Sequence, residues 1–203
     1  TEIYNHGAYG IWARDSEITG YNLVMGNAGF ASLAATIGGE YNFTHSTFAN
    51  YWNRGIRQLP AVLVNNYQDN EEESGQVTRV INDLIAANFT NCIFDGNSNI
   101  EFVLDKVEGS VFDYSVSNSM LRFNDVNGAF ANNIELDFTN PNYQNNILNG
   151  FLHFRNPQKN DFVIGQDSDA INKAISTLFS MDILGVDRSI SPDIGAYQHV
   201  IFE

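Results

Sequence analysis

The sequence is poor in several residue types, and each shortage narrows the classes of protein it can belong to. Cys92 is the single cysteine, so no disulfide can form within the chain. Lys and Arg number 10 against 24 Asp and Glu, and the formal net charge is −14. That balance argues against nucleic acid and against polyanionic substrates such as pectate, because both require clustered basic side chains. No apolar run reaches the roughly 18 residues of a membrane-spanning helix.

The residues that are present favour β-structure. Hydrophobic residues make up 43% of the 203 positions, which is enough for one well-buried core. Charged residues are only 17%. Most of the remaining polarity comes from Asn, Ser, Thr, Gln and Gly, which are typical of short strands joined by many turns. We therefore expect an all-β protein.

Two segments of the chain nearly repeat each other. Residues 42–50 read NFTHSTFAN and residues 88–96 read NFTNCIFDG, an offset of 46 residues. Each segment alternates apolar and polar residues and is bounded by polar ones, as a β-strand would be. Related strands at a fixed offset indicate equivalent places in a stacked repeat.

A shorter period runs through the first part of the chain. Ile11 and Leu33 are 22 residues apart, and Ile18 and Tyr41 are 23 residues apart. This period, with two or three short strands in each repeat, predicts a right-handed parallel β-helix (a solenoid) of about four to five coils with a C-terminal cap. Alternation with polar residues turns Phe43, Phe48, Phe89 and Phe94 inward, so we expect them to stack in interior columns.

Domain organisation follows from this prediction. Residues 1–150 would form the coils, and residues 151–203 the last coil and a capping segment. An insertion at 67–86 would explain why the two related segments lie two periods apart, with a solvated acidic loop followed by one short helix over 77–87. Further strands are expected at 111–116, 121–123, 130–137 and 162–164, and a short helix from 168. The first five residues read as the middle of a coil, so we expect the chain to be the C-terminal part of a longer precursor.

The end of the chain carries a recognisable motif. It comprises Asp182-Ile183-Leu184-Gly185, then Arg188, then Pro192-Asp193-Ile194-Gly195-Ala196-Tyr197. This motif, together with residues 38–52, 60–67 and 91–93, resembles right-handed parallel β-helix surface lipoproteins of the Bacteroidetes. The resemblance implies an exported protein on the outer-membrane surface or outside the cell. It brings no catalytic motif with it.

A non-catalytic role is therefore our leading expectation: a binding or scaffold module that meets other outer-membrane or cell-surface proteins. The candidate partner-binding residues are Trp52, Arg54, Arg57, Tyr67, Asp69, Glu71, Glu72 and Glu73. A structural role in the cap is expected for Arg188, Asp193, Gly195 and Tyr197, with the guanidinium bonding to carbonyl groups.

The alternative is a carbohydrate-active enzyme or a glycan-binding domain. Glycosidases use paired carboxylates, and Asp95 with Glu101, or Asp105 with Asp113, could form such a pair. The four histidines share no metal-ligand spacing, and no cofactor is expected. Ca²⁺ remains an open alternative, either at Asp167 and Asp169 or at Asp69 with neighbouring glutamates.

Overall fold

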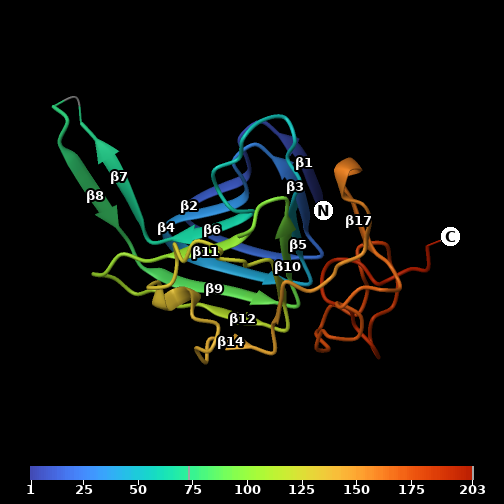
Figure 1. Ribbon diagram of the computed structural model, residues 1–203. Coiled ribbons are helices and arrows are strands. Elements are labelled where there is room, and N and C mark those ends of the chain that lie inside the picture. The colour runs from blue at the N-terminus through green and yellow to red at the C-terminus, as the bar shows by residue number, and fades with distance from the viewer. Residues whose placement is uncertain (73, 203) are drawn as a thin grey trace.

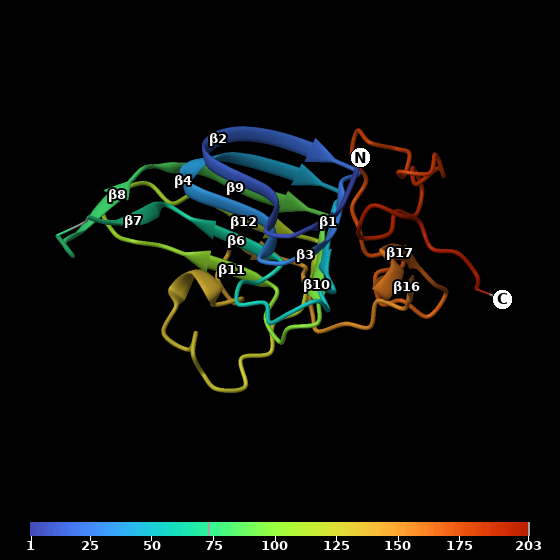
Figure 2. The same cartoon turned by 90° about the horizontal axis from the view of Figure 1, so that it is seen from above.

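The computed structural model describes residues 1–72 and 74–202, and it is all-β (Figure 1). Sheet A is parallel, in the order β1 (Glu2–His6), β3 (Val24–Ala28), β5 (Thr47–Asn50), β10 (Ile93–Gly96), β13 (Met120–Leu121) and β15 (Ile147–Leu148). Sheet B is also parallel, in the order β11 (Phe102–Asp105), β6 (Val62–Asn65), β4 (Ala31–Thr44), β9 (Leu84–Thr90), β12 (Ser115–Ser117) and β14 (Tyr143–Gln144), with β2 (Tyr9–Tyr21) on β4. Sheet A stands across one end of sheet B (Figure 2).

Two antiparallel hairpins complete the strand pairing. The first consists of β7 (Tyr67–Glu71) and β8 (Val77–Ile81), and the second of β16 (Phe154–Asn156) and β17 (Asp161–Ile164). Two single turns of 3₁₀-helix, η1 (Ile134–Leu136) and η2 (Pro157–Lys159), are also present. No helix in the described residues is long and apolar enough to cross a membrane.

Strand β4 gives sheet B its curvature. Ile37, Gly38 and Gly39 have φ angles of 63°, 73° and 109°, a left-handed run that bends the strand. Before the bend β4 pairs with β6, and after it with β9, while β2 follows β4 along both halves. A Cβ on Gly38 would lie 2.3 Å from the carbonyl oxygen of Asp83, so the bend leaves no room for a side chain there.

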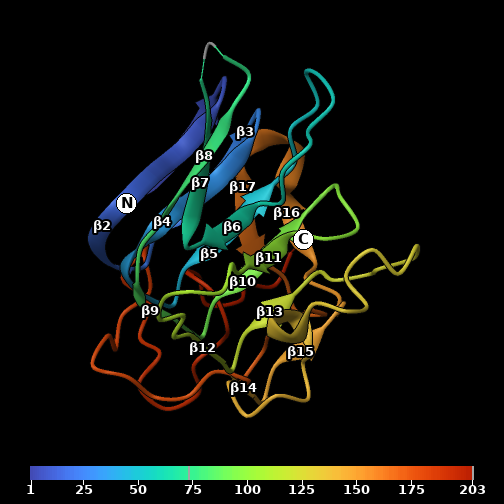
Figure 3. The same cartoon turned by 90° about the vertical axis from the view of Figure 1, so that its left-hand side faces the viewer.

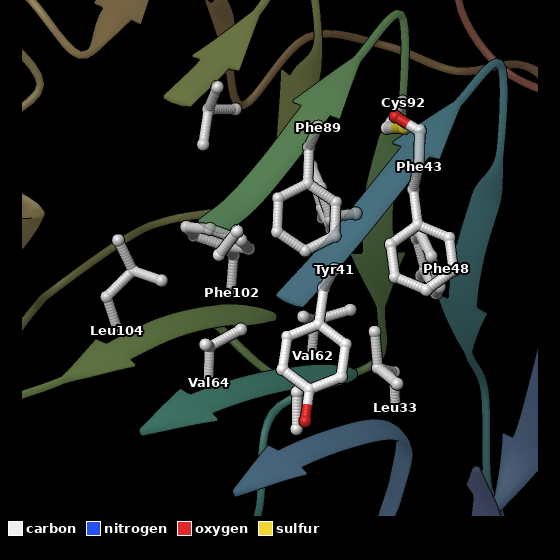
Figure 4. Packing of buried hydrophobic residues seen from close by; sticks show 14 of the residues in the cluster. Leu33, Tyr41, Phe43, Phe48, Val62, Val64, Phe89, Cys92, Phe102 and Leu104 are labelled. Carbon is white, nitrogen blue, oxygen red and sulfur yellow. The ribbon is translucent and has the colours of Figure 1, made fainter. Parts of the chain in front are cut away.

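The core lies between the two sheets and is rich in phenylalanine (Figure 4). Phe43 stacks on Phe89 with ring centroids 5.6 Å apart, and Phe48 stacks on Phe94 at 5.6 Å. Each stacked pair is also a register pair, between β4 and β9 in one case and β5 and β10 in the other. The predicted interior phenylalanine columns are therefore confirmed, as are the pairings of Ile11 with Leu33 and of Ile18 with Tyr41.

The predicted right-handed parallel β-helix of four to five coils is wrong, although the all-β class is correct. Strand pairing is mixed, because two antiparallel hairpins accompany the parallel sheets. Sheet B also branches at β4, which holds β6 and β9 along the same edge. The residue period identified neighbouring strands correctly, but a period does not determine how strands are grouped into sheets or how the sheets end.

The insertion contains a hairpin where one helix was expected over residues 77–87. Residues 77–81 form β8, which pairs with β7, and residues 84–90 form β9. β-branched Val77, Thr78, Val80 and Ile81 favour an extended backbone over a helix. Because β4 pairs directly with β9, the offset between the repeated segments reflects an insertion and not an intervening strand.

The chain after β13 is mostly irregular. No strand forms at 130–137, because local turns satisfy that backbone: the amides of Asn133 and Leu136 donate to the carbonyls of Phe130 and Asn133. The short helix predicted from residue 168 is replaced by turns. Expected strand 162–164 does form within β17, but in an antiparallel hairpin.

The final segment packs against the outer face of sheet A. Phe162, Ile164 and Ile194 are buried in two apolar clusters there. The amide of Gly195 donates to the carbonyl of Asn91 at 2.9 Å, and the amide of Ala196 donates to Oγ1 of Thr47 at 3.1 Å. Sheet A is thus covered on both faces, by sheet B on one side and by this segment on the other.

Candidate partner-binding surface

The hairpin of β7 and β8 is the most prominent projection of the molecule. It extends from the end of sheet B that lies away from sheet A (Figures 1 and 3). Tyr67 pairs with Ile81 at its base, and Glu71 with Val77 near its tip. The two strands form a two-stranded sheet of their own. An isolated two-stranded hairpin is marginally stable in water, so its base must be anchored by other contacts.

The anchor is built around Tyr67. Its hydroxyl donates to Oδ2 of Asp105 on β11 at 2.7 Å, and the guanidinium of Arg79 lies 4.6 Å from the centre of its ring. Burial, with a contribution from the Asp105 carboxylate, raises the pKa of Tyr67 to about 12. The phenol therefore remains a hydrogen-bond donor at neutral pH and ties the hairpin to sheet B.

The second tie runs across the hairpin itself. Nε and Nη2 of Arg79 bond to the two carboxylate oxygens of Asp69, at 2.5 and 2.7 Å. This bidentate bond lowers the pKa of Asp69. Asp69 is a candidate partner-binding residue, but here its charge is already matched, so it serves first to hold the two strands together.

The tip of the hairpin is open to solvent. Glu71 and Glu72 are exposed, and Glu73 lies outside the described residues. Val77 and Val80 on the facing strand are 60% and 44% exposed. The hairpin therefore presents acidic and aliphatic side chains together on an anchored element, an arrangement that suits contact with another protein.

The second predicted cluster, in the loop before β6, behaves differently. Arg57 forms an ion pair with Glu101, and the two side chains are only 2% and 0% exposed. Arg57 also donates to the carbonyl of Leu59 at 2.7 Å and to Oγ of Ser98 at 2.8 Å. Arg57 therefore braces this loop and is not free to meet a partner.

Trp52 and Arg54 remain on the surface of this loop. The guanidinium of Arg54 lies 6.0 Å from the Trp52 ring centre, and the Trp52 carbonyl accepts from Nδ2 of Asn97 at 2.6 Å. A neighbouring hollow of about 340 Å³ is lined by Tyr9, Phe30, Ile56, Gln58 and Leu59. Sequence reasoning missed this hollow because its residues come from three separate turns and strands.

Aromatic side chains gather beside that hollow. Tyr9 stacks on Trp12 with ring centroids 5.2 Å apart, and it meets Phe30 edge-on at 5.4 Å. Trp12 is 54% exposed and Phe30 is 49% exposed. Arg14 lies over the Trp12 ring at 5.3 Å. Exposed aromatic rings of this kind can bind either sugars or protein side chains.

Asp95 and Glu101, one of the two carboxylate pairs considered for catalysis, are engaged elsewhere. Oδ1 of Asp95 bonds to Nε of Arg122 at 2.6 Å, and the other oxygen accepts the hydroxyl of Tyr51. Glu101 is paired with Arg57, and its Oε2 also accepts the amide of Ala61 at 2.7 Å. Each acid of the Asp95 and Glu101 pair thus has its own cation, which is the arrangement of a structural ion pair.

A small cavity of about 60 Å³ lies beside Asp95 and Arg122, with Met120, Gly150 and Leu152 among its walls. It has room for little more than a water molecule or two. Among residues 1–72 and 74–202, no group of three His, Cys, Asp or Glu side chains is placed to share a metal ion.

The four expected cap residues lie in the segment that covers sheet A. Nη1 and Nη2 of Arg188 donate to the carbonyls of Gly195 and Ala196, at 3.1 and 3.0 Å. Asp193 accepts the amides of Asn172 and His199, at 2.8 and 2.7 Å. Burial lowers the pKa of Arg188 to about 10, and the charges of Asp182 and Asp193 oppose that shift.

Gly195 and Tyr197 belong to the same turn. Gly195 has a φ of 100°, and a Cβ there would lie 2.5 Å from the side chain of Ile93. The hydroxyl of Tyr197 donates to Glu2 at 2.8 Å, which joins the two ends of the chain. These contacts are those that a structural role requires, and none of these polar groups points into an open site.

Comparisons with known proteins give no assignment. No protein-family model matches the sequence, and neither a curated protein nor a solved structure matches it. The functional argument therefore rests on the residues and contacts of this chain.

Proposed function

We propose that this protein is a non-catalytic binding module that contacts another protein through the hairpin of β7 and β8. The observation that carries the proposal is the combination of an exposed tip with an anchored base. Glu71, Glu72, Val77 and Val80 are exposed, while the Tyr67 hydroxyl and the Arg79–Asp69 bond fix the strands that present them. Pre-ordering reduces the entropy lost on binding, so such an element makes a better contact than a free loop.

The side chains of the hairpin indicate the chemistry of the partner. Its tip is acidic, and Val77, which pairs with Glu71, is 60% exposed, so the complementary surface is basic beside an apolar contact. Resemblance of the C-terminal motif to surface lipoproteins supports an exported module at the outer membrane or outside the cell. The partner is then another protein of that surface.

Site-specific photo-cross-linking tests this proposal in native cells. A photoreactive amino acid at Val77 should give one discrete cross-linked species, whereas the same group at Val126, which is 69% exposed on another loop, should give none. Changing Glu71 and Glu72 together to Lys should abolish the cross-link. The matched control is the E108K/D113K variant, which makes the same charge change at exposed positions outside the hairpin. Equal cross-linking from Val77 and Val126 would rule out the hairpin as the contact.

Glycan binding is the second candidate, and the aromatic cluster of Tyr9, Trp12 and Phe30 favours it. Sugar rings stack on exposed aromatic faces, and a neutral glycan meets no repulsion from the acidic surface. Binding of neutral oligosaccharides, measured by calorimetry and lost in W12A and F30A, would support this reading. Binding that survives both substitutions would exclude the cluster as the site.

A further inference from the structure

Five corner residues form a column where sheet B passes into sheet A. Thr44 pairs with Thr90 in register, so the residues that follow them, His45 and Asn91, are neighbours. The same pairing extends the column to the corners after β2, β12 and β14. Each corner residue has a left-handed backbone, with φ between 46° and 57°. The column consists of Asn22, His45, Asn91, Asn118 and Asn145.

Residues 173–181, which we call the strap, run along this column within the C-terminal segment beside sheet A (Figures 1 and 2). The strap has no regular strand or helix of its own. Asparagine side chains hold it in the reverse order of the sequence: Asn118 bonds to the carbonyl of Lys173, Asn91 to Ile175 and Asn22 to the carbonyl of Met181. The column is therefore the main polar anchor of the strap.

Asn91 is the strongest of these anchors, because its amide bonds to both backbone groups of Ile175. Its Nδ2 donates to the Ile175 carbonyl at 2.8 Å, and its Oδ1 accepts the Ile175 amide at 3.0 Å. A backbone N–H only donates and a carbonyl only accepts, so these two bonds fix the orientation of the side-chain amide. The other hydrogen of Nδ2 is left for Nε2 of His45, which lies 3.0 Å away. Nε2 must therefore accept, and the neutral ring carries its proton on Nδ1.

Histidine is the odd member of an otherwise all-asparagine column, and it alone titrates near neutral pH. His45 and Asn91 are both 0% exposed. A second proton on the ring would sit on Nε2 and face the Nδ2 donor of Asn91. Turning the Asn91 amide over would accept that proton, but it would set both amide atoms against the wrong backbone groups of Ile175. A protonated His45 and a bound strap therefore leave buried polar groups unpaired.

We propose that residues 173–181 are an acid-released strap, which detaches from the corner column when His45 takes up a proton. The proton enters at Nε2, the Asn91 amide gives up Ile175, and the strap leaves the corner between the two sheets. This inference concerns a different part of the molecule from the hairpin and does not rest on the proposed function.

The surroundings of His45 keep the strap bound at neutral pH. Burial lowers the pKa of His45 to about 3, and the guanidinium of Arg188 adds to that shift, while the backbone of Gly195 and Asp193 opposes it. The other titratable groups of the elements packed around this corner are Asp182, Asp193 and His199 in the cap, Lys173 on the strap and Cys92 on the strand side. The two aspartates offset the charge of Arg188, and burial raises the pKa of the Cys92 thiol to about 12, so it stays neutral.

Acid shifts this balance toward release. When the strap detaches, water reaches His45 and its pKa moves back toward the ordinary value of about 6.5. Between that value and the lowered pKa of the bound state, the released form binds more protons than the bound form. The bound strap therefore loses stability as the pH falls through this range.

The tautomer of His45 tests the geometry directly. Long-range ¹H–¹⁵N NMR spectra of the wild type at pH 7 should show Nε2 without a proton and Nδ1 with one. A proton on Nε2 would overturn the proposal, because the Asn91 amide would then face the other way and could not hold Ile175.

Amide hydrogen exchange at Ile175 measures the release. After correction for the intrinsic rate, its protection in the wild type should fall by up to about 100-fold between pH 7 and 4.5. The control is His45→Asn, which completes the asparagine column and does not titrate, and in this variant the protection should not depend on pH. Phe89, in the core, should stay more protected than Ile175 at both pH values. Unchanged protection at Ile175 in the wild type, or an equal protection of Ile175 and Phe89 at pH 4.5, would overturn the proposal.

Discussion

Arg57 and Glu101 form an ion pair that excludes water, with the two side chains only 2% and 0% exposed. The carboxylate of Glu101 also accepts the amides of Ala61 and Ser98, at 2.7 and 2.8 Å. The pair therefore joins the loop before β6 to the turn before β11. Removing one partner of such a buried pair strongly destabilises the folded state, because the remaining charge is left without compensation.

Replacing Arg57 with Ala should lower the free energy of unfolding by about 3–5 kcal/mol, because the Glu101 carboxylate would remain buried and unpaired. Urea denaturation measures the change. Arg54→Ala is the matched control in the same loop, and it should change the free energy by less than about 0.5 kcal/mol. Similar effects from the two variants would show that the Arg57 pair does not stabilise the loop.

Removing one ring from the phenylalanine columns should be similarly costly. Phe89 is 0% exposed and contacts the rings of Phe43, Phe48, Phe94 and Phe102. Phe89→Ala should reduce the free energy of unfolding by about 3–5 kcal/mol through lost burial and the cavity left behind. Phe151→Ala, at a ring that is 60% exposed, should have little effect. If the two variants melt at the same temperature, the columns are not the core.

Acid should destabilise the protein through His45. This residue is 0% exposed, and burial, helped by the charge of Arg188, lowers its pKa to about 3. The unfolded chain protonates the same group near its ordinary value of about 6.5. Between these two pH values the unfolded state binds more protons than the folded state. Lowering the pH therefore decreases the free energy of unfolding, by up to about 1.4 kcal/mol per pH unit.

The His45→Asn variant isolates that effect. Asparagine tolerates the left-handed backbone of residue 45, which has a φ of 46°, and it does not titrate. Above pH 6.5 the two proteins should respond to pH alike, and between pH 6 and 4 the wild type should lose stability faster. Parallel pH profiles across this range would contradict the assignment. Urea denaturation at a series of pH values supplies the measurement.

The anchor of the hairpin can be tested without disturbing the core. Tyr67→Phe removes the hydroxyl that bonds to Asp105 and leaves the ring under Arg79. Amide hydrogen exchange in β7 and β8 should become faster, while exchange in β9 should keep its wild-type rate. The free energy of global unfolding should stay within about 1 kcal/mol of the wild-type value. Unchanged exchange in the hairpin would mean that the Arg79–Asp69 bond is sufficient by itself.

Local pairing could be predicted from the sequence, and the overall architecture could not. The spacing of Ile11 from Leu33 and of Phe43 from Phe89 gave the correct strand neighbours, because related apolar residues recur where strands lie side by side. That spacing contains no information that β6 and β9 share one edge of β4. The branch depends on the bend at Ile37, a β-branched residue with a φ of 63° that no local propensity predicts.

The candidate site shows the same division. The acidic composition of residues 67–75 predicts a solvated loop. It does not predict the pairing of residues 67–71 with 77–81, because the weak strand propensities of 77–81 are also compatible with a helix. Closeness in sequence groups Arg57 with Trp52 and Arg54. Its true partner, Glu101, lies 44 residues away, and only the folded chain brings the two together.

The two ends of the β7–β8 hairpin lie next to each other, since the amide of Asn82 donates to the carbonyl of Asn66 at 3.0 Å. The segment between Asn66 and Asn82 can change in length and in sequence without altering the distance between its two ends. The two parallel sheets can therefore stay unchanged in evolution while the hairpin diversifies. The same position is an insertion point at which a foreign peptide could be displayed.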